Sequence, residues 1–100
     1  MEKTAFLSIT QADKNSMIAK AIVSRELEIF SYELNIENYE RALLNPAIDP
    51  NFRKRLIDLL VTENVELKKS IAIYESLKVA IPPADLQAAV SAAALAMKAP

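Results

Sequence analysis

The sequence of 100 residues contains no glycine, no cysteine and no histidine. Because glycine supplies most positive-φ turns and hairpin corners, its absence argues against a β-rich fold and removes the glycine loops that cradle phosphates. Without cysteine and histidine there are no disulfides, no thiol nucleophiles and no cysteine or imidazole metal ligands, and the commonest general base is missing. We therefore predict no enzyme activity, no cofactor, no metal site and no small-molecule substrate.

The sequence also lacks the features that direct a chain to a nucleic acid or a membrane. Its net charge is only -1, so no global field attracts it to phosphates. No segment approaches the roughly 20 consecutive apolar residues of a membrane span, and the first residues lack the apolar stretch of a signal peptide. These absences predict a cytoplasmic protein with no nucleic-acid or membrane partner.

The residues that are present favour helices. The chain is 52% hydrophobic and 25% charged, and its Ala, Leu, Glu and Lys residues are interrupted mainly by five prolines. Ser8 or Thr10 can cap a first helix, and Asp49 before Pro50 is a strong start for a second. The pattern predicts one all-α domain over residues 1–100, with helices at about 10–44, 50–80 and 84–98.

The link between the first two predicted helices is short, which forces them to lie antiparallel as neighbours. Each carries a heptad-like apolar stripe, so we expect a long, coiled-coil-like helical hairpin. The third helix is short and rich in alanine. We expect it to lie near the open end of the hairpin, over Val79 and Ala72, or alternatively to reach a neighbouring chain.

The first helix has a second apolar stripe on another face, and the second helix has a weaker counterpart. A two-helix hairpin buries only one face of each helix, and the third helix is half their length, so part of this surface should stay uncovered. The predicted partner interface consists of Val23, Leu27, Phe30, Leu34, Ile57 and Val61. The alternative is a closed three-helix monomer in which the third helix covers both stripes.

Polar residues interrupt the predicted seam of the hairpin. Pairing residues of the two helices one by one outward from the link places Arg25 opposite Ser70 and Tyr32 opposite Glu63. Buried polar groups in such a seam can fix the register of two helices at some cost in stability. We interpret these four residues as a polar registry layer, with a pocket around a perturbed Glu63 as the alternative.

The first helix also carries five glutamates with no intervening lysine or arginine, namely Glu26, Glu28, Glu33, Glu37 and Glu40. We interpret them as a solvated face, with Glu37 and Glu40 forming ion pairs across the hairpin to residues 53–55. The overall prediction is a non-catalytic protein–protein interaction module: a self-associating assembly, an adaptor or a structural component. The alternative is a small helical inhibitor or regulator that binds a nucleic-acid enzyme through the acidic face.

Overall fold

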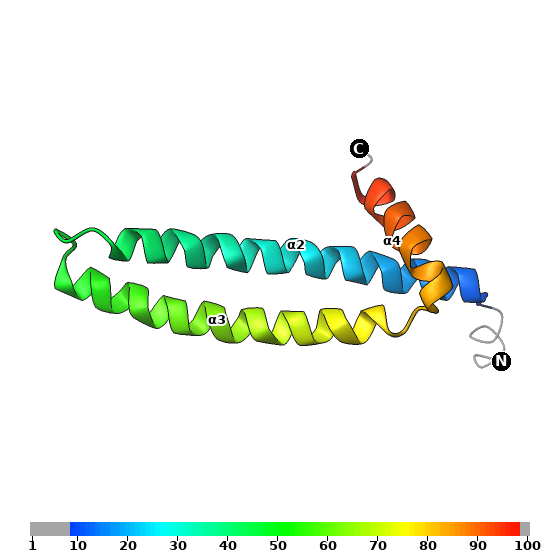
Figure 1. Ribbon diagram of the computed structural model, residues 1–100, viewed down its shortest axis with the longest axis horizontal. Helices are drawn as coiled ribbons and strands as arrows, with labels where there is room; N and C mark the ends of the chain where they lie inside the picture. Colours follow the sequence, from blue (N-terminus) through cyan, green and yellow to red (C-terminus); the bar gives the residue numbers. More distant parts are fainter. Residues whose placement is uncertain (1–8, 99–100) are drawn as a thin grey trace.

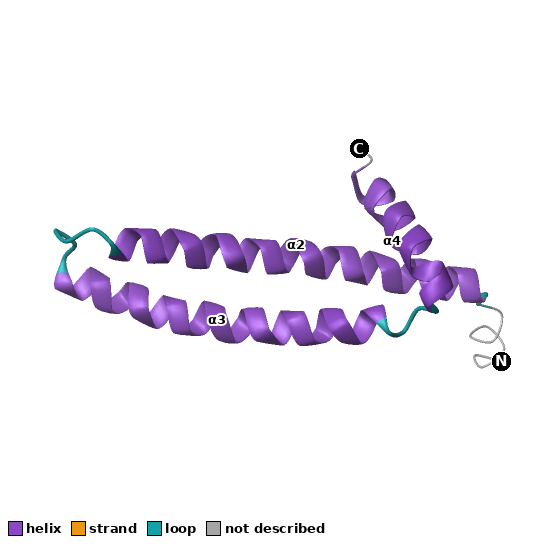
Figure 2. Ribbon diagram, viewed as in Figure 1, coloured by secondary structure: helices purple, strands orange, loops and turns teal. Residues whose placement is uncertain are grey.

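The computed structural model describes residues 9–98, which form three α-helices and, within that range, no strand (Figure 2). The helices are α2 (Gln11–Leu43), α3 (Pro50–Lys78) and α4 (Pro83–Lys98). The predicted all-α fold is confirmed, and the predicted helix ends lie within about two residues of the observed ones, the usual uncertainty of a helix end.

Local side-chain contacts explain where the two long helices begin. The Thr10 hydroxyl accepts a hydrogen bond of 3.0 Å from the Asp13 amide and caps α2. The Asp49 carboxylate accepts from two amides of the first turn of α3, each at 3.1 Å, and Pro50 occupies the first helical position. These contacts satisfy amides that have no partner inside the helix. Ser8, the other predicted cap, lies outside the described residues.

The antiparallel hairpin of α2 and α3 is a rod rather than a compact body (Figure 1). The molecule measures 62 × 28 × 27 Å, and its radius of gyration is 19.1 Å. A compact chain of this length has a radius of gyration of about 13 Å. The rod shape means that most of the hairpin has only one neighbouring helix to pack against.

The third helix, α4, lies near the open end of the hairpin, as predicted, but not over Val79 and Ala72. It packs chiefly on α2 near the open end of the hairpin, while Val79 and Ala72 on α3 are exposed (Figure 1). The physical reason lies in the turn between α3 and α4. Ile81 is only 1% exposed, because its side chain inserts into the core on the α2 side and directs the chain across that helix.

The hydrophobic core therefore sits at the open end of the rod, where α4 crosses α2. Its buried members are Ala19, Ile22, Val23, Ile81 and Ala93. Tyr74 and Leu77 of α3 pack against this cluster, so all three helices meet there. Near the loop end, Leu56 is the one other buried hydrophobic residue in the described part of the chain. Between these two points the hairpin is held largely by partly buried side chains.

Candidate functional site

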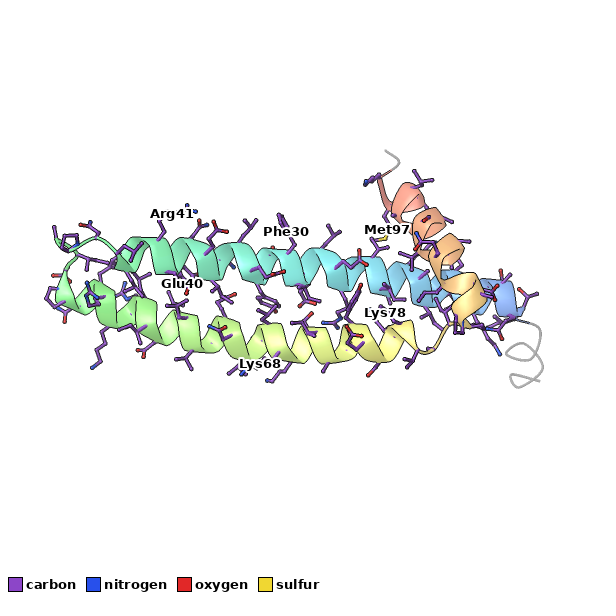
Figure 3. The ribbon with its side chains drawn as sticks, in the orientation of Figure 1. Phe30, Glu40, Arg41, Lys68, Lys78 and Met97 are labelled. Carbon is purple, nitrogen blue, oxygen red and sulfur yellow. The ribbon has the colours of Figure 1, made fainter. Side chains whose placement is uncertain are left out.

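A row of exposed apolar side chains runs along the outer side of α2. Leu27, Phe30 and Leu34 are spaced by three and four residues, which places them on one helix face. They are 61%, 60% and 42% exposed, respectively. Phe30 points away from α3 (Figure 3). We refer to these three residues as the α2 edge.

Val23 differs from the other residues of the predicted interface. It is only 8% exposed and belongs to the core beneath α4. Because Val23 lies four residues before Leu27, α4 covers the first member of the stripe and leaves the next three uncovered. Val23 therefore contributes to folding, and the surface open to a partner begins at Leu27.

A second exposed apolar row lies on α3. Ile57 and Val61 are 47% and 62% exposed, and Val65 extends the same row by one turn. Lys68 points away from α2 (Figure 3), and Val61 lies seven residues earlier on nearly the same helix face. We refer to Ile57, Val61 and Val65 as the α3 edge.

The two edges lie on opposite sides of the hairpin. Phe30 of the α2 edge points away from α3, and Lys68, which shares a helix face with Val61 of the α3 edge, points away from α2 (Figure 3). The predicted interface residues therefore do not form a single patch. One compact partner cannot cover both edges at once without wrapping round the rod, whereas two partners can each cover one edge.

Glutamates predominate beside the α2 edge, although Arg41 lies seven residues beyond Leu34 on the same face, and two lysines together with Asp58 border the α3 edge. Glu26, Glu33 and Glu37 lie on one flank of the α2 edge, within a stretch of five glutamates and no basic residue. The α3 edge instead lies between Lys54 and Lys68, which are both exposed. Neither lysine forms an ion pair within residues 9–98.

The ion pairs predicted across the hairpin do not form in the described part of the chain. Each of its four salt bridges joins residues of the same helix, three or four positions apart. Glu37 pairs with Arg41 at 2.8 Å, and Arg53 donates instead to the Leu43 carbonyl at 3.4 Å. A partner one turn away on the same helix is always within reach, so Glu37 has a local partner that competes with the other helix.

A polar network joins α2 to α3 in the middle of the rod, and Glu28 is its centre. The Glu28 carboxylate accepts hydrogen bonds from Arg25 at 2.6 Å, Tyr32 at 3.1 Å and Ser70 at 3.2 Å. Ser70 is 2% exposed, so its hydroxyl depends on this acceptor. Three predicted members of the polar layer thus meet around a residue that the sequence analysis placed in the solvated row.

Glu63, the fourth predicted member, lies outside this network. It accepts a hydrogen bond of 3.5 Å from Asn35. The sequence paired Glu63 with Tyr32 and Ser70 with Arg25, and in each case the observed partner on α2 is three residues further along. Because residues three apart share a helix face, the apolar stripes of α2 and α3 still face each other after this shift. The polar side chains, however, meet different partners. This one-turn difference is what hid Glu28 from sequence reasoning.

Two tyrosines at the seam have perturbed acidity. The hydrogen bond to Glu28 raises the pKa of Tyr32, with burial and the negative charge of Glu28 acting in the same direction. Burial raises the pKa of Tyr74, helped by its hydrogen bond of 3.1 Å to Glu26. In both cases a carboxylate acceptor favours the neutral phenol, which donates the hydrogen bond. Tyr74 thereby joins α3 to α2, and Tyr32 joins two successive turns of α2.

An open cleft of about 500 Å³ lies between the start of α2 and α4. Its lining is mainly alanine, with Asn15 donating to Asp85 across it at 3.4 Å. Gln11 donates in turn to Asn15 at 2.8 Å, so the buried amide already has partners. The hydrogen bond between Asn15 and Asp85 joins α2 to α4 across the cleft.

Among residues 9–98, no group of three or more acidic side chains is placed to hold a metal ion. No single helix in that range is long and apolar enough to cross a membrane. Only α3 and α4 together, across a bend of 120°, reach the required length and composition.

Comparison of the chain with protein-family models, with curated proteins and with solved structures finds no match.

Proposed function

We propose that this chain is a non-catalytic protein–protein interaction module that assembles with copies of itself. The observation that carries the proposal is the pair of exposed apolar rows, the α2 edge and the α3 edge. Each places three apolar side chains on one helix face in contact with water. A contiguous apolar surface of this kind, bordered by charged residues, is typical of an interface.

The surface area of the molecule supports the same proposal. The chain exposes 7475 Å², whereas a compact monomer of 11.1 kDa exposes about 5,700 Å². The surplus is roughly a third of the expected surface. A standard protein interface removes about 800 Å² from each partner, so the rod has ample surface to bury on assembly.

The acidic face of α2 offers less support for the alternative of an inhibitor directed at a nucleic-acid enzyme. Three of its five glutamates already have partners within the chain. Glu26 accepts from Tyr74, Glu28 accepts from Arg25 and Ser70, and Glu37 pairs with Arg41. A mimic of nucleic-acid phosphates needs its carboxylates free for a basic partner.

Light scattering on the wild-type chain and on Phe30→Asp tests the proposal. The wild type should show a mass above the 11.1 kDa of one chain, rising with concentration, and the variant should be monomeric. Leu44→Asp is the matched control: Leu44 is also exposed but lies at the end of α2, away from both edges. Phe30 lies outside the core, so helical content should be unchanged in both variants. A wild-type chain that stays monomeric at every concentration would refute the proposal.

A further inference from the structure

We infer that assembly places the α2 edge of one copy against the α3 edge of the next, so that hairpins line up side by side. The inference rests on the proposed self-association and names the two surfaces that meet. The charges beside the edges and the spacing of residues along them are the observations that support it.

Contacts between identical edges bring like charges together. On the α3 edge, Lys54 and Lys68 each lie seven residues from Val61. Two α3 edges centred on Val61 therefore place Lys54 opposite Lys68 when the helices are antiparallel, and each lysine opposite its own copy when they are parallel. Two α2 edges bring together two helices that each carry five glutamates and no basic residue between positions 26 and 40.

A contact between the two different edges brings opposite charges together. Glu37 lies seven residues from Phe30, the same spacing that separates each lysine from Val61. When Phe30 of one copy packs on Val61 of the next, Glu37, which also pairs with Arg41 of its own helix, therefore meets Lys54 if the helices are antiparallel and Lys68 if they are parallel. In either direction one lysine meets Glu37, while the other lies opposite Val23, beneath α4; neither contact between identical edges brings such opposite charges together.

The apolar residues match over the same length. Around a contact of Phe30 with Val61, the remaining members of each edge lie one turn before and one turn after the centre. Leu34 and Leu27 then meet Ile57 and Val65, in an order that depends on the helix direction. Each row spans about 10–12 Å, so neither extends far beyond the other.

This contact is heterologous, since the surfaces that meet are different. In a pair, the copy that uses its α2 edge keeps its α3 edge uncovered, and the other copy keeps its α2 edge uncovered. A further copy can therefore bind at either end of the pair. Because the edges lie on opposite sides of the hairpin, successive copies form a row. The surplus surface of the monomer leaves room for two contacts of about 800 Å², one at each edge.

Mixing two variants tests the arrangement. Phe30→Asp disables the α2 edge and leaves the α3 edge intact, whereas Val61→Asp does the reverse. Each variant alone should be monomeric, and an equimolar mixture should form a one-to-one complex with about twice the 11.1 kDa mass of one chain. Leu44→Asp should assemble as the wild type does, and circular dichroism should show the same helical content for all four proteins.

The outcomes separate this inference from the proposed function. If Val61→Asp alone still assembles like the wild type, or if the mixture gives no complex, the pairing of different edges is wrong while self-association stands. If the wild type itself is monomeric, both proposals fall.

Charge exchange tests the contact independently and reports the helix direction. Glu37→Lys should weaken assembly by about fivefold to tenfold, since an exposed attraction becomes a repulsion. Adding Lys54→Glu in the same chain should restore assembly if the helices are antiparallel, and adding Lys68→Glu should restore it if they are parallel. Failure of both second substitutions to restore assembly would overturn the inference.

Discussion

The Ser70 hydroxyl of α3 donates a hydrogen bond of 3.2 Å to the Glu28 carboxylate of α2. This contact joins residues that are 42 positions apart and lies on the loop side of the core, closer to the core than to the loop. Around it, apolar packing between α2 and α3 tolerates sliding by one turn, because residues three or four apart share a face. We propose that the Glu28 network selects one register for the hairpin, as buried polar residues do in coiled coils.

Replacing Glu28 tests this role. Glu28→Ala leaves the Ser70 hydroxyl buried without its acceptor and releases Arg25, so we expect the free energy of unfolding to fall by about 1–2 kcal/mol. Urea denaturation measures the loss. Glu33→Ala is the control, since Glu33 is exposed and makes no hydrogen bond or ion pair within residues 9–98, and it should change stability by less than about 0.5 kcal/mol. Equal effects of the two substitutions would contradict a special role for Glu28.

Truncating Ile81 should release α4. Ile81 is 1% exposed and packs in the core that α4 shares with α2, so Ile81→Ala should cost about 2–4 kcal/mol. Hydrogen exchange should become faster in α4 and around Val23, while the loop half of the hairpin keeps its protection. Val79→Ala, two residues earlier and 84% exposed, should leave both measurements nearly unchanged. Slow exchange in α4 of the Ile81 variant would show that other contacts hold this helix.

Much of the fold could be predicted because its determinants are local. Asp49, Pro50 and Thr10 set helix starts through contacts within one turn, and Pro82 and Pro83 separate α3 from α4. The helix on which α4 packs could not be predicted, since it depends on where Ile81 inserts. The sequence shows that this side chain is apolar, but it does not show which of the two neighbouring helices the side chain packs against.

The candidate site was predicted in part for a related reason. The exposed positions of Leu27, Phe30 and Leu34 agree with the surplus apolar surface expected from the sequence. Residue spacing within one helix does not show how two helices are turned toward each other. The sequence prediction nevertheless joined the rows on α2 and α3 into one surface. The orientation of each helix toward the other places them on opposite sides. Val23 was included because its spacing matches the stripe, and only the path of α4 buries it.

The perturbed tyrosines predict a loss of stability at alkaline pH. The pKa values of Tyr32 and Tyr74 are raised in the folded chain above the ordinary tyrosine value of 10.0, so folding favours the protonated phenols. Their contribution is fully present below pH 10.0 and is lost as the pH rises through the higher folded values. Comparing the unfolding free energy of the wild type with that of Tyr32→Phe/Tyr74→Phe across this range measures the effect. An identical pH dependence of the two proteins would contradict it.

Asp49 caps α3, and a conservative substitution at this position should retain most of the stability that the cap provides. The Asp49 carboxylate accepts from the Asn51 and Phe52 amides, so Asp49→Ala should lower the free energy of unfolding by about 1 kcal/mol. Asp49→Asn keeps a side-chain oxygen in the same place and should recover most of that loss. Chemical denaturation of the three proteins checks this order. Equal instability of the two variants would mean that the negative charge at the helix start, rather than the hydrogen bonds, is responsible.

Salt dependence separates self-assembly from the alternative of an acidic inhibitor. In the proposed row of hairpins, apolar packing around Phe30 supplies most of the affinity, and added salt screens only the exposed contact of Glu37 with a lysine. Because such a pair contributes at most about 1 kcal/mol, raising the ionic strength tenfold should weaken assembly by less than about tenfold. Binding through many carboxylates would instead weaken far more steeply, and it would survive Phe30→Asp. Sedimentation at low and high salt, with wild type and Phe30→Asp side by side, therefore assigns the affinity either to the apolar edge or to the acidic face.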